Sequence, residues 1–107
     1  MANVTDKNPA KDDGMTPLHS AAGNGHVGVC RLIMDNISDK NPAANNGETP
    51  LHIAARRGYV EVYRVIMANV SEKTPRDFNG KTPLDLAERF KETEVCQLLR
   101  TEMMKKD

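Results

Sequence analysis

One block of sequence occurs three times in this chain at a constant spacing of 33 residues. The tetrapeptide Thr-Pro-Leu-His at residues 16–19 recurs at residues 49–52, and residues 82–85 repeat it as Thr-Pro-Leu-Asp. A glycine precedes each copy at the same step, and Ala-Ala follows the first two copies. When residues 7–39 are aligned with residues 40–72 without gaps, more than half of the positions are identical. A fixed period of this length indicates a duplicated structural unit, so we expect a row of stacked repeats.

The repeat register divides a single domain, residues 1–107, into units. We expect residues 1–6 to be the tail of a preceding repeat, because residues 1–4 are identical to residues 67–70. The units that follow are 7–39 as repeat one, 40–72 as repeat two and 73–107 as a C-terminal capping repeat. The register favours a piece of a longer array, with a natural protein that has a ragged first repeat as the alternative.

Composition narrows the classes of function that this chain can serve. Fifteen basic and fifteen acidic residues balance, so bulk electrostatics does not support binding to nucleic acid or to a membrane surface. No apolar run approaches the roughly 18 residues of a membrane span, and no signal-peptide core follows Met1. Two cysteines are too few for a disulfide scaffold. We therefore expect an intracellular, cytoplasmic protein, with a nuclear location also open.

Each unit is expected to form two short helices joined by a turn. Thr16 can cap free backbone N–H groups, and Pro17 fits the first helical position, where its missing donor costs nothing. Gly25 and Gly58 should end the first helices after about two turns. The second helices carry broad apolar stripes, formed by Val27, Val29, Cys30, Leu32 and Ile33 in unit one and by Val60, Val62, Tyr63, Val65 and Ile66 in unit two. Such wide stripes need helices on both sides, which a stack supplies. The segment rich in Asn, Asp, Gly and Pro that follows should fold back as a short hairpin at the edge of the stack.

These motifs resemble the ankyrin repeat family. The resemblance is carried by the 33-residue period, Gly-x-Thr-Pro-Leu-His, Ala-Ala and Gly-His/Tyr-x-x-Val, and it covers essentially the whole chain. It implies an all-α repeat solenoid of helix–turn–helix pairs, each with a short β-hairpin finger that projects roughly perpendicular to the helices. It also implies the family's usual function, which is protein–protein recognition in the cytoplasm or nucleus.

The sequence departs from the family pattern at a few positions. The family usually places a glycine just after the second helix, where this chain has Val4, Ile37 and Val70. We expect these residues to be buried against the next layer and the preceding Asn3, Asn36 and Asn69 to end the helices. Unit three has Asp85 in place of histidine and Lys91 in place of glycine. Its polar end, residues 100–106, is typical of a capping repeat with a solvated outer face.

The reactive side chains do not form a catalytic, metal-binding or cofactor-binding set. His19 and His52 should lie roughly 10 Å apart in neighbouring repeats, whereas a metal needs nitrogens about 2 Å away. We predict that they form hydrogen bonds that brace Thr16, Thr49 and nearby backbone. Cys30 and Cys96, two repeats apart, should be too distant for a disulfide, and are therefore expected to be free and buried. His26 is expected to be an ordinary surface residue.

The resemblance places partner binding on the finger tips and on the exposed side of the first helices, which together form a concave groove. The finger candidates are Asp12, Asp13, Met15, Asn45, Asn46, Glu48, Phe78, Asn79 and Lys81. The first-helix candidates are Asn24, Arg56, Arg57, Arg89 and Phe90. We predict a groove that is acidic at its N-terminal end and basic toward its C-terminal end, with a merely solvated face as the alternative. Phe78 and Phe90 beside arginines are typical interface anchors. For Phe90, packing into the C-terminal cap is the alternative.

The sequence thus predicts a protein–protein interaction module, with an acidic segment of the partner docked at units two and three. The alternative is a regulatory or targeting segment of a larger enzyme or channel whose active domain is absent here. A stand-alone enzyme is not expected, because stacked repeats leave no pocket of convergent titratable groups. No cofactor, nucleic acid or membrane insertion is expected. Modest stability or self-association through the N-terminal end is also expected, since Leu18, Val27 and nearby residues should expose apolar surface there.

Overall fold

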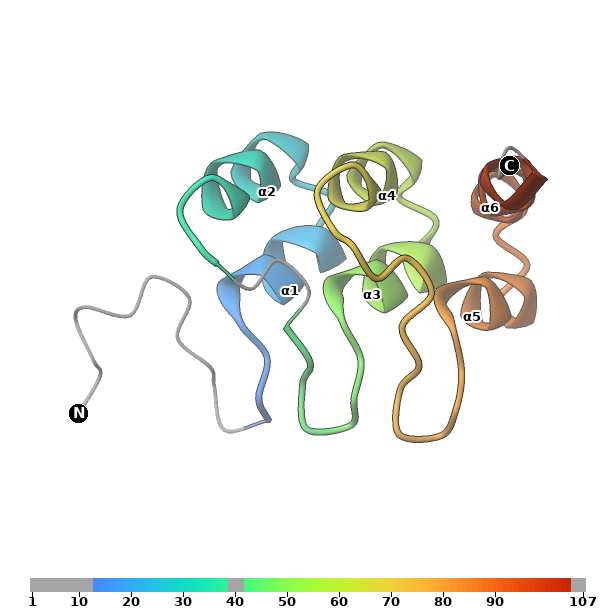
Figure 1. Cartoon of the computed structure of the whole chain (residues 1–107), viewed down its shortest axis with the longest axis horizontal. Coiled ribbons are helices and arrows are strands. Elements are labelled where there is room, and N and C mark those ends of the chain that lie inside the picture. Colours follow the sequence, from blue (N-terminus) through green and yellow to red (C-terminus); the bar gives the residue numbers. More distant parts are fainter. Residues whose placement is uncertain (1–12, 39–41, 105–107) are drawn as a thin grey trace.

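Six helices in three pairs make up the part of the chain that the computed structural model describes, residues 13–38 and 42–104 (Figure 1). They are α1 (Pro17–Gly23), α2 (Val27–Met34), α3 (Pro50–Arg57), α4 (Val60–Met67), α5 (Pro83–Arg89) and α6 (Thr93–Met104). Each pair falls within one of the units expected from the 33-residue period. The predictions for Asn3, Val4, Asp12 and the tail at residues 1–6 lie outside the described residues.

The helices form two rows of equivalent elements. α1, α3 and α5 contact one another in order, and α2, α4 and α6 do the same in a second row beside them (Figure 1). Hairpin loops project from the first row on the side away from the second. This arrangement confirms the predicted all-α repeat solenoid. None of the described helices is long and apolar enough to cross a membrane.

The first helices begin and end as the sequence predicts. Thr16 and Thr82 each accept a hydrogen bond at Oγ1 from the backbone N–H three residues later, and Pro follows each cap. Asp85 replaces the histidine of the other units but completes the same cap, because its Oδ2 accepts from the Thr82 N–H at 2.9 Å. Gly58 ends α3 in the left-handed region, at φ 75°. Lys91 stands at the equivalent position in unit three and adopts φ 59°, so the glycine is replaced without a change of turn.

A buried histidine joins each of the first two units to the next. His19 Nδ1 accepts from the Thr16 N–H at 3.0 Å, so the opposite nitrogen carries the proton and Nε2 donates to the Glu48 carbonyl at 2.8 Å. His52 repeats the arrangement one unit later, with the Thr49 N–H at 3.0 Å and the Lys81 carbonyl at 2.8 Å. The predicted bracing of Thr16 and Thr49 is confirmed, and the same side chains also hold the following finger.

The fingers are tight hairpin turns. The second closes through the Ala44 N–H to the Glu48 carbonyl at 2.8 Å, and the third through the Asp77 N–H to the Lys81 carbonyl at 2.9 Å. Each finger also bonds to the one before it: the Asn45 N–H donates to the Asp13 carbonyl at 2.9 Å, and the Phe78 N–H to the Asn46 carbonyl at 3.0 Å. These few bonds form no β-strand in residues 13–38 and 42–104, so the expected hairpins are present without strand structure.

An asparagine two residues beyond each of the helices α2 and α4 caps a carbonyl of the last turn, and an apolar residue follows it. Asn36 Nδ2 donates to the Leu32 carbonyl at 2.9 Å, and Asn69 Nδ2 donates to the Val65 carbonyl at 2.8 Å. Val70 is buried and Ile37 is half-buried against the core. The structure therefore confirms the expected roles of these asparagines and places both following side chains against the stack.

In the row of second helices, the apolar residues of α4 are covered by α2, whereas the equivalent residues of α2 are exposed. Val62 and Val65 of α4 are only 1% and 8% exposed, because α2 packs against α4. The equivalent Val29 and Leu32 of α2 are 45% and 65% exposed. The expectation that a helix covers each side of the α2 stripe is therefore wrong for these two residues, since no described helix lies beyond α2 on that side.

The open apolar surface differs from the one expected at the N-terminal end. Leu18 is fully buried and Val27 is half-buried. Leu18 belongs to the core formed between α1 and its neighbours, so it has no exposed face to offer. The exposed surface instead lies on the second row, at Val29 and Leu32.

Candidate functional site

The face formed by α1, α3, α5 and the fingers collects most of the predicted partner-binding residues. Ten of the described candidates are exposed: Asp13, Asn24, Asn45, Asn46, Arg57, Phe78, Asn79, Lys81, Arg89 and Phe90. Met15 and Arg56 are half-buried and Glu48 is buried, while Asp12 lies outside the described residues. The repeat places equivalent residues one unit apart along this face, so its chemistry can be compared position by position.

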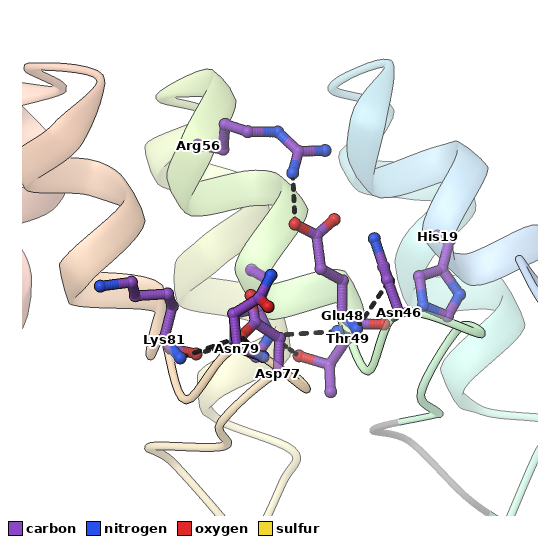
Figure 2. Close-up of polar contacts among 9 residues, drawn as sticks. His19, Asn46, Glu48, Thr49, Arg56, Asp77, Asn79 and Lys81 are labelled. Carbon is purple, nitrogen blue, oxygen red and sulfur yellow. Dashed lines mark hydrogen bonds and ion pairs between the residues drawn. The ribbon is translucent and has the colours of Figure 1, made fainter.

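Glu48 and Arg56 form an ion pair in unit two. Arg56 Nη1 donates to Glu48 Oε2 at 2.6 Å, and the Glu48 residue is 8% exposed (Figure 2). The Glu48 backbone is fixed as well, because its N–H donates to Asn46 Oδ1 at 3.0 Å and its carbonyl accepts from His19. Glu48 is therefore not the exposed finger residue that the sequence predicts. Its carboxylate neutralises Arg56, which leaves Arg57 as the cation of α3 that faces solvent unpaired among the described residues.

The same two positions carry different chemistry in the other units. In unit one they are Met15 and Gly23, which have no charge. In unit three they are Lys81 and Arg89, both exposed and neither in an ion pair with a described residue. These two positions are thus uncharged in unit one, form an ion pair with each other in unit two and carry, in unit three, two cations that are unpaired among the described residues.

Unit three exposes two aromatic side chains, and one of them lies beside a cation. Phe78 at the tip of the third finger is 75% exposed and Phe90 at the end of α5 is 48% exposed, so Phe90 is not enclosed in the C-terminal cap. The Arg89 guanidinium carbon lies 5.9 Å from the centre of the Phe90 ring, within cation–π range. A ligand at this end of the face meets positive charge and apolar surface together.

Asp85 lies midway in sequence between Lys81 and Arg89, and its carboxylate is engaged at the start of α5. Its pKa is lowered mainly by the hydrogen bond from the Thr82 backbone, with help from the Thr82 hydroxyl and from the charges of Lys81 and Arg76. Because the carboxylate already caps the helix, it moderates the positive charge of unit three without pairing with Lys81 or Arg89.

The buried histidines are engaged in hydrogen bonds, and both cysteines belong to the apolar core. Both ring nitrogens of His19 and of His52 are occupied by hydrogen bonds, and burial lowers the pKa of each ring despite the neighbouring Glu48 and Asp77 charges. Cys30 and Cys96 are free and buried, and burial raises the pKa of Cys30 to about 11, so its thiol stays protonated. Residues 13–38 and 42–104 contain no group of three potential metal ligands.

Two features of the structure escaped the sequence analysis. The Glu48–Arg56 pair joins a finger residue before the helix cap to the last turn of α3, and helical periodicity does not apply because Glu48 lies outside the helix. The sequence does contain one signal for this pair. Glu48 and Lys81 occupy equivalent positions of neighbouring repeats, so the charge at this position changes sign from unit two to unit three. Tyr63 is fully buried and its hydroxyl has no hydrogen-bond partner among the described residues, which its place in an apolar stripe did not reveal.

Comparison with protein families matches this architecture. A model described as "Ankyrin repeats (3 copies)" matches residues 1–77 and again residues 39–107, which together span the chain. A comparison with curated proteins found no match.

Proposed function

The chain belongs to the ankyrin repeat family, and from that premise we propose that it binds another protein through the face formed by α1, α3, α5 and the fingers. Ankyrin repeats are in general protein–protein interaction modules and are typically non-catalytic. The partner that this proposal envisages is a protein with an acidic segment docked at units two and three.

The main observation behind this proposal is that buried positions of the repeat keep the same residues from unit to unit, whereas some exposed positions do not. Residues that hold the stack are the same in units one and two, as at Thr16 and Thr49 or at His19 and His52, and all four are buried. Some exposed positions on the face differ in every unit, such as the one that Asn24, Arg57 and Phe90 occupy. Side chains that contribute little to stacking yet present charge and aromatic surface in one row are suited to recognising a ligand.

The acidic character of the partner segment is inferred from the unpaired cations. Arg57, Lys81 and Arg89 are exposed on this face in units two and three, and none is paired with a described carboxylate. The exposed Asp13 lies at the opposite end, in unit one. Charge complementarity of this kind steers association and fixes the orientation of the bound segment.

Affinity capture with charge-reversed variants tests the proposal. The chain with Arg57→Glu and Arg89→Glu should lose its captured partner, because two cations of the face are reversed. The matched control reverses Arg31 and Arg64, which are exposed on the second helices, and should retain the partner. Retention by the face variant, or equal loss in both variants, would show that binding does not use this face.

Self-association is a second proposal and is carried by Val29 and Leu32. Their equivalents Val62 and Val65 are covered by a second helix, so a second copy of the chain is proposed to cover this exposed apolar pair. Sedimentation velocity should detect a concentration-dependent dimer that Leu32→Glu abolishes. Gln97→Glu, the same final residue on the exposed side of α6, should leave the dimer unchanged. A monomer at all concentrations would contradict the proposal.

A further inference from the structure

The ion pair in unit two shows where a carboxylate is held on this face. Glu48 Oε2 lies 2.6 Å from Arg56 Nη1, a short charge-assisted contact between the base of a finger and the last turn of α3. The position one unit later brings together the base of the third finger and the last turn of α5, occupied by Lys81 and Arg89.

The backbone at the two positions is held in the same way. The Glu48 carbonyl accepts from the Ala44 N–H and from His19, and the Lys81 carbonyl accepts from the Asp77 N–H and from His52. The backbone of Lys81 therefore makes the same hydrogen bonds as the backbone of Glu48, but the Lys81 side chain carries the opposite charge. In Figure 2 its side chain projects away from the Glu48–Arg56 pair.

No neighbouring carboxylate takes the place that Glu48 fills in unit two. Asp85 caps α5 through Thr82, and Asp77 Oδ1 accepts the backbone N–H groups of Asn79 and Lys81. Glu88 pairs with Arg100 of α6 at 2.7 Å. Among the described residues, neither Lys81 nor Arg89 is therefore paired with a carboxylate, although the two occupy the positions that Glu48 and Arg56 occupy in unit two.

We propose that a glutamate or aspartate side chain of the partner protein places its carboxylate between Lys81 and Arg89, as the Glu48 carboxylate is placed on Arg56 in unit two. This site deepens the proposed function and rests on it, because it supplies the acidic group of the bound segment. The Arg89 guanidinium carbon lies 5.9 Å from the centre of the Phe90 ring, and a guanidinium in such a contact can still donate from its edge to a planar carboxylate. The exposed Phe78 and Phe90 rings provide apolar contact for the residues beside the carboxylate.

Arginine side-chain NMR on the full chain tests the site with two blocked peptides as probes. Acetyl-Phe-Glu-amide carries the carboxylate, and acetyl-Phe-Gln-amide is its uncharged match. The glutamate peptide should shift the Nε–Hε signal of Arg89 in a saturable way and leave that of Arg56, already paired with Glu48, unmoved. The glutamine peptide should bind at least about tenfold more weakly, as expected for loss of one charge-assisted contact.

One substitution places the missing carboxylate within the chain itself. Lys81→Glu should pair with Arg89 as Glu48 pairs with Arg56, and should weaken binding of the glutamate peptide by about tenfold or more. The control Arg31→Glu makes the same change from a cation to a glutamate on α2 and should leave peptide binding unchanged. An Arg89 signal that does not move, equal binding of the two peptides, tighter binding of a phosphoserine analogue, or full binding by Lys81→Glu would each overturn the carboxylate site.

This outcome is separable from the proposed function. If Arg57→Glu with Arg89→Glu loses its protein partner while Lys81→Glu and the glutamate peptide show no effect, the face binds protein but the carboxylate site is wrong. If the peptide binds as described while the double variant keeps every captured protein, the site stands as a carboxylate site and the proposed function fails.

Discussion

Two valines at equivalent positions of neighbouring repeats allow the free energy of stacking to be measured. It is the difference between the losses of stability caused by replacing each of them with alanine. Val62 of α4 is 1% exposed beneath α2, whereas Val29 of α2 is 45% exposed at the open end. Val62→Ala removes two buried carbon groups, which costs about 1.6 kcal/mol at about 0.8 kcal/mol each, and the cavity raises this to about 2–3 kcal/mol. Val29→Ala removes half-solvated groups and leaves no closed cavity, so its cost is below about 0.8 kcal/mol.

The change in helix propensity is the same for Val62→Ala and Val29→Ala, so it does not affect the difference between them. Alanine is a better helix former than valine by roughly 0.5 kcal/mol, and both residues lie in eight-residue helices. The net expectation is a loss of about 2 kcal/mol in the free energy of unfolding for Val62→Ala and almost none for Val29→Ala.

Urea unfolding followed by far-ultraviolet circular dichroism suits a chain without tryptophan. With a slope of about 1 kcal/mol per molar urea, the midpoint of Val62→Ala should fall by about 2 M. Measuring at two protein concentrations separates stacking within the chain from association at the open end. Equal midpoints for the two variants would refute the reasoning, because α2 would then be as well covered as α4.

The remaining predictions concern buried polar groups and glycines. Because His19 and His52 have folded-state pKa values below the ordinary 6.5, the unfolded chain binds protons more readily. The free energy of unfolding, measured by urea titration, should be constant above about pH 6.5 and fall below it, by about 1.4 kcal/mol per histidine for each unit by which the pKa is lowered. A midpoint unchanged from pH 7 to 5.5 would contradict this. Tyr63→Phe should raise the free energy of unfolding by about 1 kcal/mol, since it deletes a buried hydroxyl without a partner, and a loss in calorimetry would show that the hydroxyl is satisfied. Gly28→Ala, in an open helical position, should stabilise by about 0.5–1 kcal/mol, whereas Gly58→Ala, at φ 75°, should destabilise by more than that; the opposite order of melting temperatures would be inconsistent with these backbone conformations.

Local and periodic features of the fold could be predicted from sequence because each unit repeats the same physical solution. Thr16, Pro17 and Gly25 specify helix boundaries through short-range rules of capping and backbone conformation. The roles of His19 and His52 followed from their recurrence beside a capping threonine. The additional bonds from these rings to the Glu48 and Lys81 carbonyls could not be foreseen, because they depend on how far the next finger folds back.

Exposure at the ends of the stack and on the concave face was harder to predict. An α-helix of seven or eight residues makes only about two turns, so a broad apolar stripe does not reveal which edge of it faces a neighbour. This is why Leu18 was expected at the open end, whereas Val29 and Leu32 lie there. The family resemblance assigns Glu48 to the exposed finger surface. Its pairing with Arg56 could not be foreseen, because it depends on side-chain reach between two elements, which the repeat period does not encode.

The central claim is that each unit completes the one before it at a constant step along the chain. A single NOESY spectrum of the labelled protein tests it at the finger row, where the Phe78 nitrogen lies beside Gly47 and the Asn45 nitrogen beside Gly14. The account predicts strong cross-peaks from the Phe78 amide proton to the Gly47 α-protons and from the Asn45 amide proton to the Gly14 α-protons. If both cross-peaks are missing from a folded sample whose other finger amides are visible, the units do not stack in this register.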